Sequence, residues 1–128
     1  MGSEFTFCDF VDGSGNNVIH DWLQTIPKKA KQKFNKQLDY LEATPLGMWS
    51  RPFVDTLSDE LFEVRVRLGT QQYRILGAHT GAQRMPILLY CFIKPDRKVP
   101  EKDCDRAKLR LEQFLVYPAK HMVEHNYE

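Results

Sequence analysis

Apolar residues in the first third of the chain recur with the spacing of α-helices. After the turn-forming stretch GSGNN, they predict a helix over residues 18–26, and Asn17 stands where it can cap that helix. A second helix follows and ends at the Thr44-Pro45 pair. A short β-like run over residues 6–12 precedes both helices. The apolar face of the second helix consists of Ala30, Phe34, Leu38 and Leu41.

From Leu61 the pattern takes the period of a β-strand. Residues 61–68 and 72–76 alternate between apolar and polar side chains, so each of these strands has one buried face. Residues 86–94, PILLYCFIK, are apolar nearly throughout, which is typical of a central strand covered on both faces. Strict alternation places Ile87, Leu89, Cys91 and Ile93 on one face of that strand. The opposite face of the three strands would carry Arg65, Arg67, Arg74, Tyr90, Phe92 and Lys94.

A last helix is predicted from Pro100, after an irregular connector over residues 45–60 that precedes the strands. Its inward residues would be Cys104, Ala107, Leu111 and Leu115, with Lys102, Arg106, Lys108 and Arg110 mostly outward. This order of elements predicts an α+β fold. A small, mostly antiparallel twisted sheet would have the amino-terminal helices packed on one face, together with a carboxy-terminal helix. We expect the helices to cover the aliphatic face and to leave the other face partly open.

The expected open face is basic and aromatic. Residues 61–100 hold seven basic residues and two acids, although the whole chain has a net charge of only +1. Such a local basic surface indicates a polyanionic partner, and cations mixed with aromatic rings suit single-stranded RNA. The residues alone leave open a second interpretation, in which these arginines pair with acids or stay solvated. For Tyr73 and Phe92 the alternatives are base stacking and a place in the core.

Length and composition indicate a single cytoplasmic domain. The chain has 128 residues, and Met1–Phe5 reads as a cloning scar, which leaves residues 6–128 for one domain. No apolar run is long enough for a membrane span, so no membrane partner is predicted. Cys8, Cys91 and Cys104 contain no C-x-x-C pair and are expected to be inert thiols in a reducing compartment.

Other kinds of chemistry find little support in the sequence. The chain contains neither G-x-S-x-G nor H-E-x-x-H. His121 and His125 are four residues apart, but they lack a third convincing ligand, so we expect both to be solvated and predict no metal. His20 and His79 are interpreted as surface residues, and no cofactor is predicted.

Three linked motifs resemble a known family. The segments LSDELFEVRV, QQYRILGAH and PILLYCFIKPDRKVPEKDCDRAKLR follow one another in the order seen in the RelE/HigB superfamily of bacterial toxins, in particular its phage-derived HigB-like branch. The upstream segment WLQTIPKKAKQKFNKQLDYLE looks like the paired amino-terminal helices of that family. The resemblance covers residues 18–115 and implies a RelE-like fold.

The resemblance also implies a function. Such a protein would be the toxin of a type II toxin-antitoxin system and a ribosome-dependent mRNA endonuclease. It would cut mRNA in the ribosomal A site and inhibit translation until a cognate helix-turn-helix, HigA-like antitoxin binds it. Arg65 matches the arginine of the first motif, Arg74 that of the second, and Lys94 and Lys98 the lysines of the third. Pro95 and Val99 depart from the pattern, where a lysine and a threonine are usual.

A metal-independent mechanism is consistent with these residues. The 2′-hydroxyl of the RNA would attack the adjacent phosphate, while Arg65 and Arg74 stabilise the added charge. Proton transfer would fall to Lys94, with Tyr90 as its substitute. The predicted RNA contacts are Arg67, Tyr73, Tyr90, Phe92, Arg97 and Lys98, and the lysines of residues 28–36 are further candidates for contacts to ribosomal RNA.

Two other hypotheses stay open. One is a non-cleaving RNA- or ribosome-binding module, a degenerate toxin of phage or prophage origin in which Pro95 and Val99 mark lost catalysis. The other is a purely structural phage protein.

Overall fold

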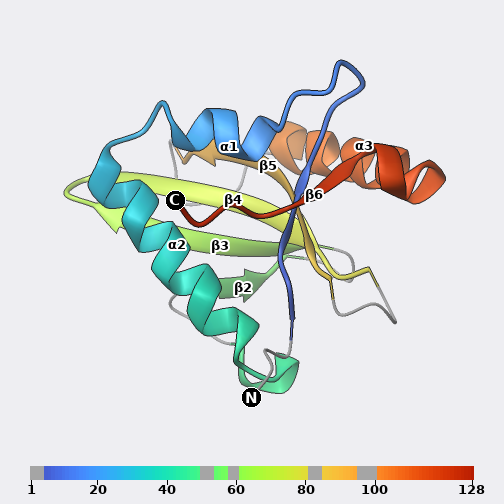
Figure 1. Cartoon of the computed structure of the whole chain (residues 1–128). Helices are drawn as coiled ribbons and strands as arrows, with labels where there is room; N and C mark the ends of the chain where they lie inside the picture. Colours follow the sequence, from blue (N-terminus) through green and yellow to red (C-terminus); the bar gives the residue numbers. More distant parts are fainter. Residues whose placement is uncertain (1–4, 50–53, 58–60, 81–84, 95–100) are drawn as a thin grey trace.

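A six-stranded sheet with helices on both faces forms the protein (Figure 1). The computed structural model describes residues 5–49, 54–57, 61–80, 85–94 and 101–128. The strand order is β2-β3-β4-β5-β1-β6, and among the described residues β1 and β5 are the one parallel pair. The predicted α+β class is therefore confirmed. The elements are β1 (Cys8–Phe10), α1 (Val18–Leu23), α2 (Lys28–Glu42), η1 (Leu46–Met48), β2 (Val54–Thr56), β3 (Phe62–Leu68), β4 (Gln71–Ala78), β5 (Ile87–Ile93), α3 (Glu101–Val116), η2 (Pro118–Lys120) and β6 (Met122–Glu124).

The two amino-terminal helices pack on one face of the sheet. The side chain of Asn17 accepts hydrogen bonds from the backbone N–H groups of Ile19 and His20, which confirms the predicted cap of α1. The helix ends at Leu23, earlier than predicted. The predicted apolar face of α2 is confirmed, because Ala30, Phe34, Leu38 and Leu41 are its buried residues. They share a core with Val64, Val66, Tyr73, Ile75 and Leu88 of the sheet.

The carboxy-terminal helix packs on the opposite face, contrary to the expectation that all helices share one face. Its buried apolar residues contact a second core made by Leu76, Ala78, Ile87, Leu89 and Phe92. The inward stripe of α3 also differs from the prediction, since Phe114 is buried whereas Leu115 is 60% exposed. Asp103 is buried in place of Cys104. The stripe therefore consists of Asp103, Ala107, Leu111 and Phe114.

A register shift between Leu76 and Gly77 corrects the predicted alternation of β5. Leu76 pairs with Tyr90 but Gly77 pairs with Leu88, so one residue of β5 is skipped. Ile87 and Leu89 consequently join Tyr90 and Phe92 on the face that packs against α3. Only glycine fits at position 77, because a Cβ there would lie 2.7 Å from the carbonyl oxygen of Ile87 and 2.6 Å from the Phe62 ring.

Two short strands were not predicted from the sequence. The first, β2, lies in the expected connector and pairs with the beginning of β3, with Asp55 opposite Glu63. The second, β6, pairs with β1 and brings residues near the carboxyl end of the chain next to those near its beginning. These additions make β2 and β6 the edge strands of the sheet.

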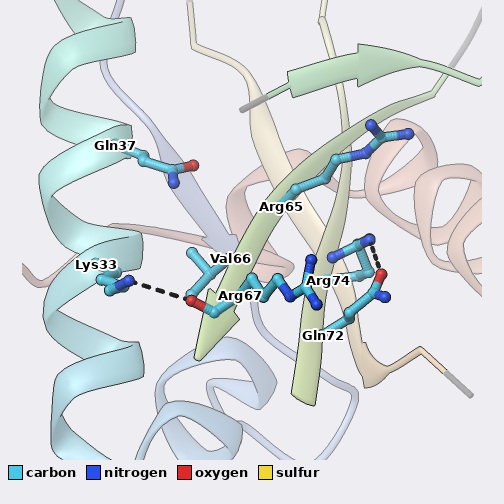
Figure 2. A pocket seen from close by; sticks show the side chains of 7 residues that line it. All are labelled: Lys33, Gln37, Arg65, Val66, Arg67, Gln72 and Arg74. Carbon is cyan, nitrogen blue, oxygen red and sulfur yellow. Dashed lines mark hydrogen bonds between the residues drawn. The ribbon is translucent and has the colours of Figure 1, made fainter. Parts of the chain in front are cut away.

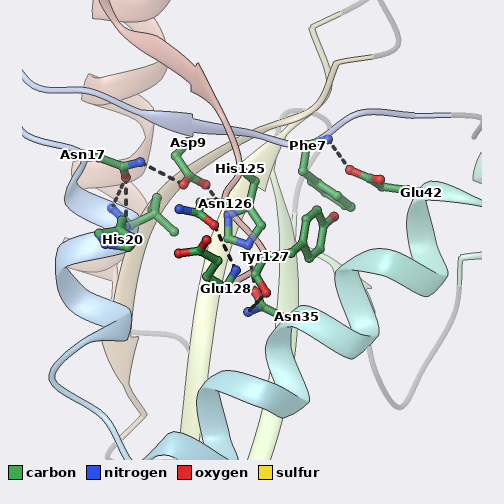
Figure 3. Close-up of polar contacts among 11 residues, drawn as sticks. Phe7, Asp9, Asn17, His20, Asn35, Glu42, His125, Asn126, Tyr127 and Glu128 are labelled. Atoms are coloured by element: carbon green, nitrogen blue, oxygen red, sulfur yellow. Dashed lines mark hydrogen bonds and ion pairs between the residues drawn. The ribbon is translucent and has the colours of Figure 1, made fainter.

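The tail that contains β6 buries both histidines predicted to be solvated. His121 stacks on Phe10 with ring centroids 5.2 Å apart, and its Nδ1 lies 2.7 Å from the carbonyl oxygen of Val11. His125 lies between Asp9, 2.7 Å from its Nδ1, and Asn35, 2.9 Å from its Nε2 (Figure 3). The side chain of Asn17 donates to the other oxygen of Asp9. We call Asp9, Asn17, Asn35 and His125 the histidine cluster.

Cys8, Cys91 and Cys104 are free thiols, as expected. Cys8 is buried, and burial raises its pKa to about 11, with Asp9 adding to the shift. Burial also raises the pKa values of Cys91 and Cys104. The three thiols therefore stay protonated near neutral pH, which suits the predicted inert role.

Candidate RNA-binding site

The two arginines predicted to act in catalysis are cross-strand neighbours. Arg65 of β3 pairs with Arg74 of β4, so their side chains leave the same face of the sheet. The next pair on this face toward the β3–β4 turn is Arg67 and Gln72. The short turn after Leu68 sets this register, because the register of a hairpin follows from the type and length of its turn.

A buried carboxylate holds the two guanidinium groups together. Glu63 is fully buried, and its Oε1 accepts a hydrogen bond of 2.9 Å from Nε of Arg65. Its Oε2 lies 3.2 Å from Nε of Arg74, a distance typical of an ion pair, although the alignment does not make a hydrogen bond. Asp55 of β2 accepts from Nη2 of Arg65 at 3.0 Å. We call Asp55, Glu63, Arg65 and Arg74 the arginine cluster.

Arg74 is the more deeply held of the two arginines. Its side chain is 7% exposed, compared with 26% for Arg65. Nη2 donates to Oε1 of Gln72 at 2.6 Å and Nη1 donates to the carbonyl oxygen of Tyr73. Burial lowers the pKa of Arg74 and the neighbouring Glu63 opposes that shift, so the guanidinium remains charged near neutral pH. Arg74 is therefore a buried part of the site, whereas the side chain of Arg65 is partly open to solvent.

A cavity of about 370 Å³ lies beside the arginine cluster (Figure 2). Its volume falls within the range typical of small-ligand sites. Nζ of Lys33 donates to the carbonyl oxygen of Arg67 at 3.2 Å, which holds α2 against β3 at this point. Four cationic and two amide side chains thus surround one cavity. The lining residues are Lys33 and Gln37 from α2, Arg65, Val66 and Arg67 from β3, and Gln72 and Arg74 from β4.

A family model for phage-derived Gp49-like proteins (DUF891) matches residues 21–112. The chain belongs to this Gp49-like family. The family is related to the RelE/HigB-like toxins. The matched span includes α2, the strands β3, β4 and β5, and most of α3, and so it contains every residue that lines the cavity. No curated protein matches the sequence significantly.

Two aromatic residues of this Gp49-like chain are not placed to stack on a base, which corrects the prediction. Tyr73 lies on the α1–α2 face and is 4% exposed, with its ring 6.2 Å from that of Trp22. Strand alternation requires this placement, because Tyr73 precedes Arg74 and neighbouring side chains leave opposite faces. Phe92 is 8% exposed beneath α3. The core alternative thus holds for both.

Tyr90 is partly exposed and has two arginines of α3 beside its ring. Arg106 donates a hydrogen bond of 2.9 Å to the Tyr90 hydroxyl. The guanidinium carbon of Arg110 lies 5.2 Å from the centre of the ring, and its Nη1 donates to the carbonyl oxygen of Leu89. The sequence predicted Arg110 to be outward, but it is half-buried and secures α3 to β5.

Of the two lysines of the third motif, the structure describes Lys94 but not Lys98. Lys94 follows β5 directly, and its backbone N–H donates to the carbonyl oxygen of Gln72 at 2.7 Å. It is half-buried and lies at the same end of the sheet as Arg67. Arg97 and Lys98 lie outside the residues that the structure describes, as do Pro95 and Val99.

The sequence left open that the arginines pair with acids, and Arg65 does pair with Glu63 and Asp55, but it identified neither these acids nor the amides of this Gp49-like site. Gln37 and Gln72 carry no local signal of a binding role, and Lys33 stood out only as one of several lysines in its helix. Glu63 has the same strand parity as Arg65, which was a usable signal that the two would meet. Asp55 could be found only once β2 was known.

The described residues contain neither a metal site nor a membrane-spanning helix. Among residues 5–49, 54–57, 61–80, 85–94 and 101–128, no group of three or more His, Cys, Asp or Glu side chains could hold a metal ion. Within the same described residues, no helix has the length and apolar character that crossing a membrane requires.

Proposed function

We propose that this Gp49-like chain is the toxin of a type II toxin-antitoxin system, of the HigB-like branch, and that it acts as a ribosome-dependent mRNA endonuclease. One observation carries the proposal: the side chains of Lys33, Arg65, Arg67 and Arg74 meet around a single cavity. A phosphodiester is the ligand that such a group of cations suits, because guanidinium groups bind phosphate oxygens in a fixed geometry. The family relationship supports RNA as the molecule that contains this phosphodiester.

The proposed reaction uses the RNA's own 2′-hydroxyl as the nucleophile. Its oxygen forms a bond to the adjacent phosphorus while the bond from phosphorus to the 5′-oxygen breaks, which gives a cyclic phosphate and a 5′-hydroxyl. Arg65 stabilises the charge that builds on the phosphate oxygens, and Arg74 fixes Arg65 through their shared partner Glu63. Lys94 transfers the protons, with Tyr90 as the alternative.

The proposed dependence on the ribosome has its physical reason in the orientation of the RNA. Arg65 and Arg67 stabilise charge but do not align a flexible RNA for attack by its 2′-hydroxyl, and orientation is a large part of such a barrier. In the ribosomal A site the mRNA would already be held in place. The exposed lysines of α2 are the proposed contacts to ribosomal RNA, and a HigA-like antitoxin would cover the cationic surface.

A non-cleaving RNA- or ribosome-binding module is the second candidate. The observation that favours it is the state of the two arginines, since Arg65 contacts two carboxylates and Arg74 is nearly buried. A binder needs only the exposed cations Lys33 and Arg67, which remain in the cavity lining. Replacement of Arg65 separates the candidates, because it would abolish cleavage by an enzyme but only weaken a binder in a salt-dependent way.

The decisive experiment is primer-extension mapping of a reporter mRNA in a purified translation reaction, with and without ribosomes. We expect cuts that require ribosomes with the wild type, their loss with Arg65→Gln, and their retention with Lys120→Gln. Lys120 is a suitable control because it is exposed in η2, does not line the cavity and is not one of the α2 lysines proposed to contact ribosomal RNA. Intact mRNA with retained ribosome binding would exclude the endonuclease and leave the binding module.

A further inference from the structure

Arg65 has two carboxylate partners that differ in burial. Glu63, which binds Nε, has a fully buried side chain, whereas Asp55, which binds Nη2, is 18% exposed. The two contacts have similar lengths, 2.9 and 3.0 Å. What distinguishes the partners is therefore the environment of each carboxylate and not the geometry of its contact.

Glu63 must keep its contacts with Arg65 and Arg74 when a ligand binds. A fully buried carboxylate without a cation costs several kcal/mol, and Glu63 relies on Arg65 and Arg74 together. When an anion approaches the cavity, Glu63 thus keeps Nε of Arg65 and fixes the direction of the guanidinium. Glu63 is a permanent counter-ion of the site.

Asp55, in contrast, can give up its contact with Arg65. It lies on the three-residue edge strand β2, and its other oxygen accepts from the backbone N–H of Thr56. A carboxylate at this depth can become hydrated when its ion pair opens, since partly exposed pairs contribute little free energy. Because Asp55 approaches from β2, its carboxylate lies at the outer nitrogen of a guanidinium that also lines the cavity.

We propose that Asp55 competes with a phosphodiester ligand of the cavity for Nη2 of Arg65. A phosphodiester oxygen takes the place of the Asp55 carboxylate when RNA binds, while Glu63 stays bound to Nε. This inference rests on the proposed function for the source of the phosphate. The exchange of one anion for another at Arg65 does not require that the RNA be cut.

Competition from Asp55 makes the site selective for polyanions. A single phosphate that displaces Asp55 replaces one ion pair with another and gains little. An RNA strand also gains contacts to Lys33 and Arg67, which line the same cavity as Arg65. Asp55 therefore raises the number of phosphate contacts that a ligand must make before it binds.

Binding of two probes to four variants tests this proposal. The probes are inorganic pyrophosphate, followed through the arginine Nε–Hε signals in NMR spectra, and fluorescently labelled hexauridylate, followed by anisotropy. The variants are wild type, Asp55→Asn, Asp39→Asn and the double variant Asp55→Asn with Arg65→Gln. Asp39→Asn is the matched control because it removes the same charge from an exposed residue of α2 that does not line the cavity.

We expect Asp55→Asn to bind both probes about 2- to 5-fold more tightly than Asp39→Asn, the factor that corresponds to one partly exposed ion pair. The double variant should lose that gain. Equal or weaker binding by Asp55→Asn, or a gain that persists without Arg65, overturns the proposal. If Asp55→Asn folds poorly, as judged by thermal melting, Asp55→Ser replaces it with the same expectations.

The pyrophosphate measurement keeps this inference separate from the proposed function. Tighter pyrophosphate binding by Asp55→Asn, in a protein that never cuts mRNA, supports the exchange at Arg65 and refutes the endonuclease. Cleavage that depends on Arg65, with pyrophosphate binding unaffected by Asp55→Asn, supports the endonuclease and refutes the exchange.

Discussion

The arginine cluster and the histidine cluster are two solutions for a fully buried carboxylate. Glu63 and Asp9 are both inaccessible to solvent. Glu63 binds two cations that line a cavity, of which Arg65 is partly exposed, whereas Asp9 binds Asn17 and His125, of which His125 has a side chain that is 1% exposed. The ring of His125 is enclosed between α2 and β1 (Figure 3).

The difference indicates which network is available for ligands. In the histidine cluster each polar side chain meets a partner from another element, so the network joins the tail, α2, β1 and the cap of α1. In the arginine cluster Arg65 keeps a side open to the cavity. We infer that the histidine cluster is structural and that the arginine cluster is the network available to bind a ligand.

The largest expected effect is the loss of Glu63. Glu63→Ala would leave Arg74 buried without its counter-ion, and we expect the free energy of unfolding to fall by about 3 to 5 kcal/mol. Urea denaturation followed by circular dichroism measures it. Asp55→Ala is the control, with an expected loss of less than about 1 kcal/mol because its ion pair is partly exposed. Equal losses for the two variants would contradict the distinction between permanent and exchangeable carboxylates.

Loss of Arg65 should affect activity more than stability. We expect Arg65→Gln to lower the rate of ribosome-dependent cleavage on the order of 100-fold, the usual cost of removing one donor to a developing negative charge. Quantified primer-extension products measure this rate. Lys120→Gln should cleave at the wild-type rate, and a similar decrease in that variant would assign the effect to general charge.

Loss of the carboxylate charge in the histidine cluster should affect stability alone. Asp9→Asn keeps the shape of the side chain but weakens its hydrogen bond to His125, and we expect a loss of about 2 kcal/mol in the free energy of unfolding. Urea denaturation measures it, and hexauridylate binding at a temperature where the variant is folded should be unchanged. Weaker RNA binding by folded Asp9→Asn would place the histidine cluster in the functional surface.

The smallest effect concerns a single exposed cation of the cavity. Lys33→Gln should weaken hexauridylate binding about 2- to 5-fold and make the dependence of log K on log salt shallower by about one phosphate contact. Anisotropy titrations at several salt concentrations give both values. Lys120→Gln again serves as the control, and identical slopes for Lys33→Gln and wild type would remove Lys33 from the site.

The part of the site that follows from local periodicity could be predicted. Alternation along β3 and β4 places Arg65 and Arg74 on one face, and the short turn between the strands makes them neighbours. The same rule placed Tyr90 and Phe92 on the face of Arg74 correctly, but it failed for Ile87 and Leu89, which the register shift at Gly77 brings to that face beside α3. Period-two reasoning assumes a regular ladder, and the skipped residue of β5 interrupts it.

Contacts between distant segments could not be predicted from the sequence. The tail near His125 is too short for a periodic signal, and its burial depends on the pairing of β6 with β1. Gln37 joins the cavity only because α2 lies against β3. In both cases a polar residue acquires its role from a partner far away in the chain, and residue type alone gives no indication of that partner.

The position of β1 between β5 and β6 constrains the order in which the protein is assembled. The strands β3, β4 and β5 follow one another and pair locally, so they can form soon after they leave the ribosome. The strand β1 is synthesised before them but must wait for residues 87–88 and then for residues 122–124. Arg65 and Arg74 can therefore meet on a nascent chain that has not yet closed its sheet.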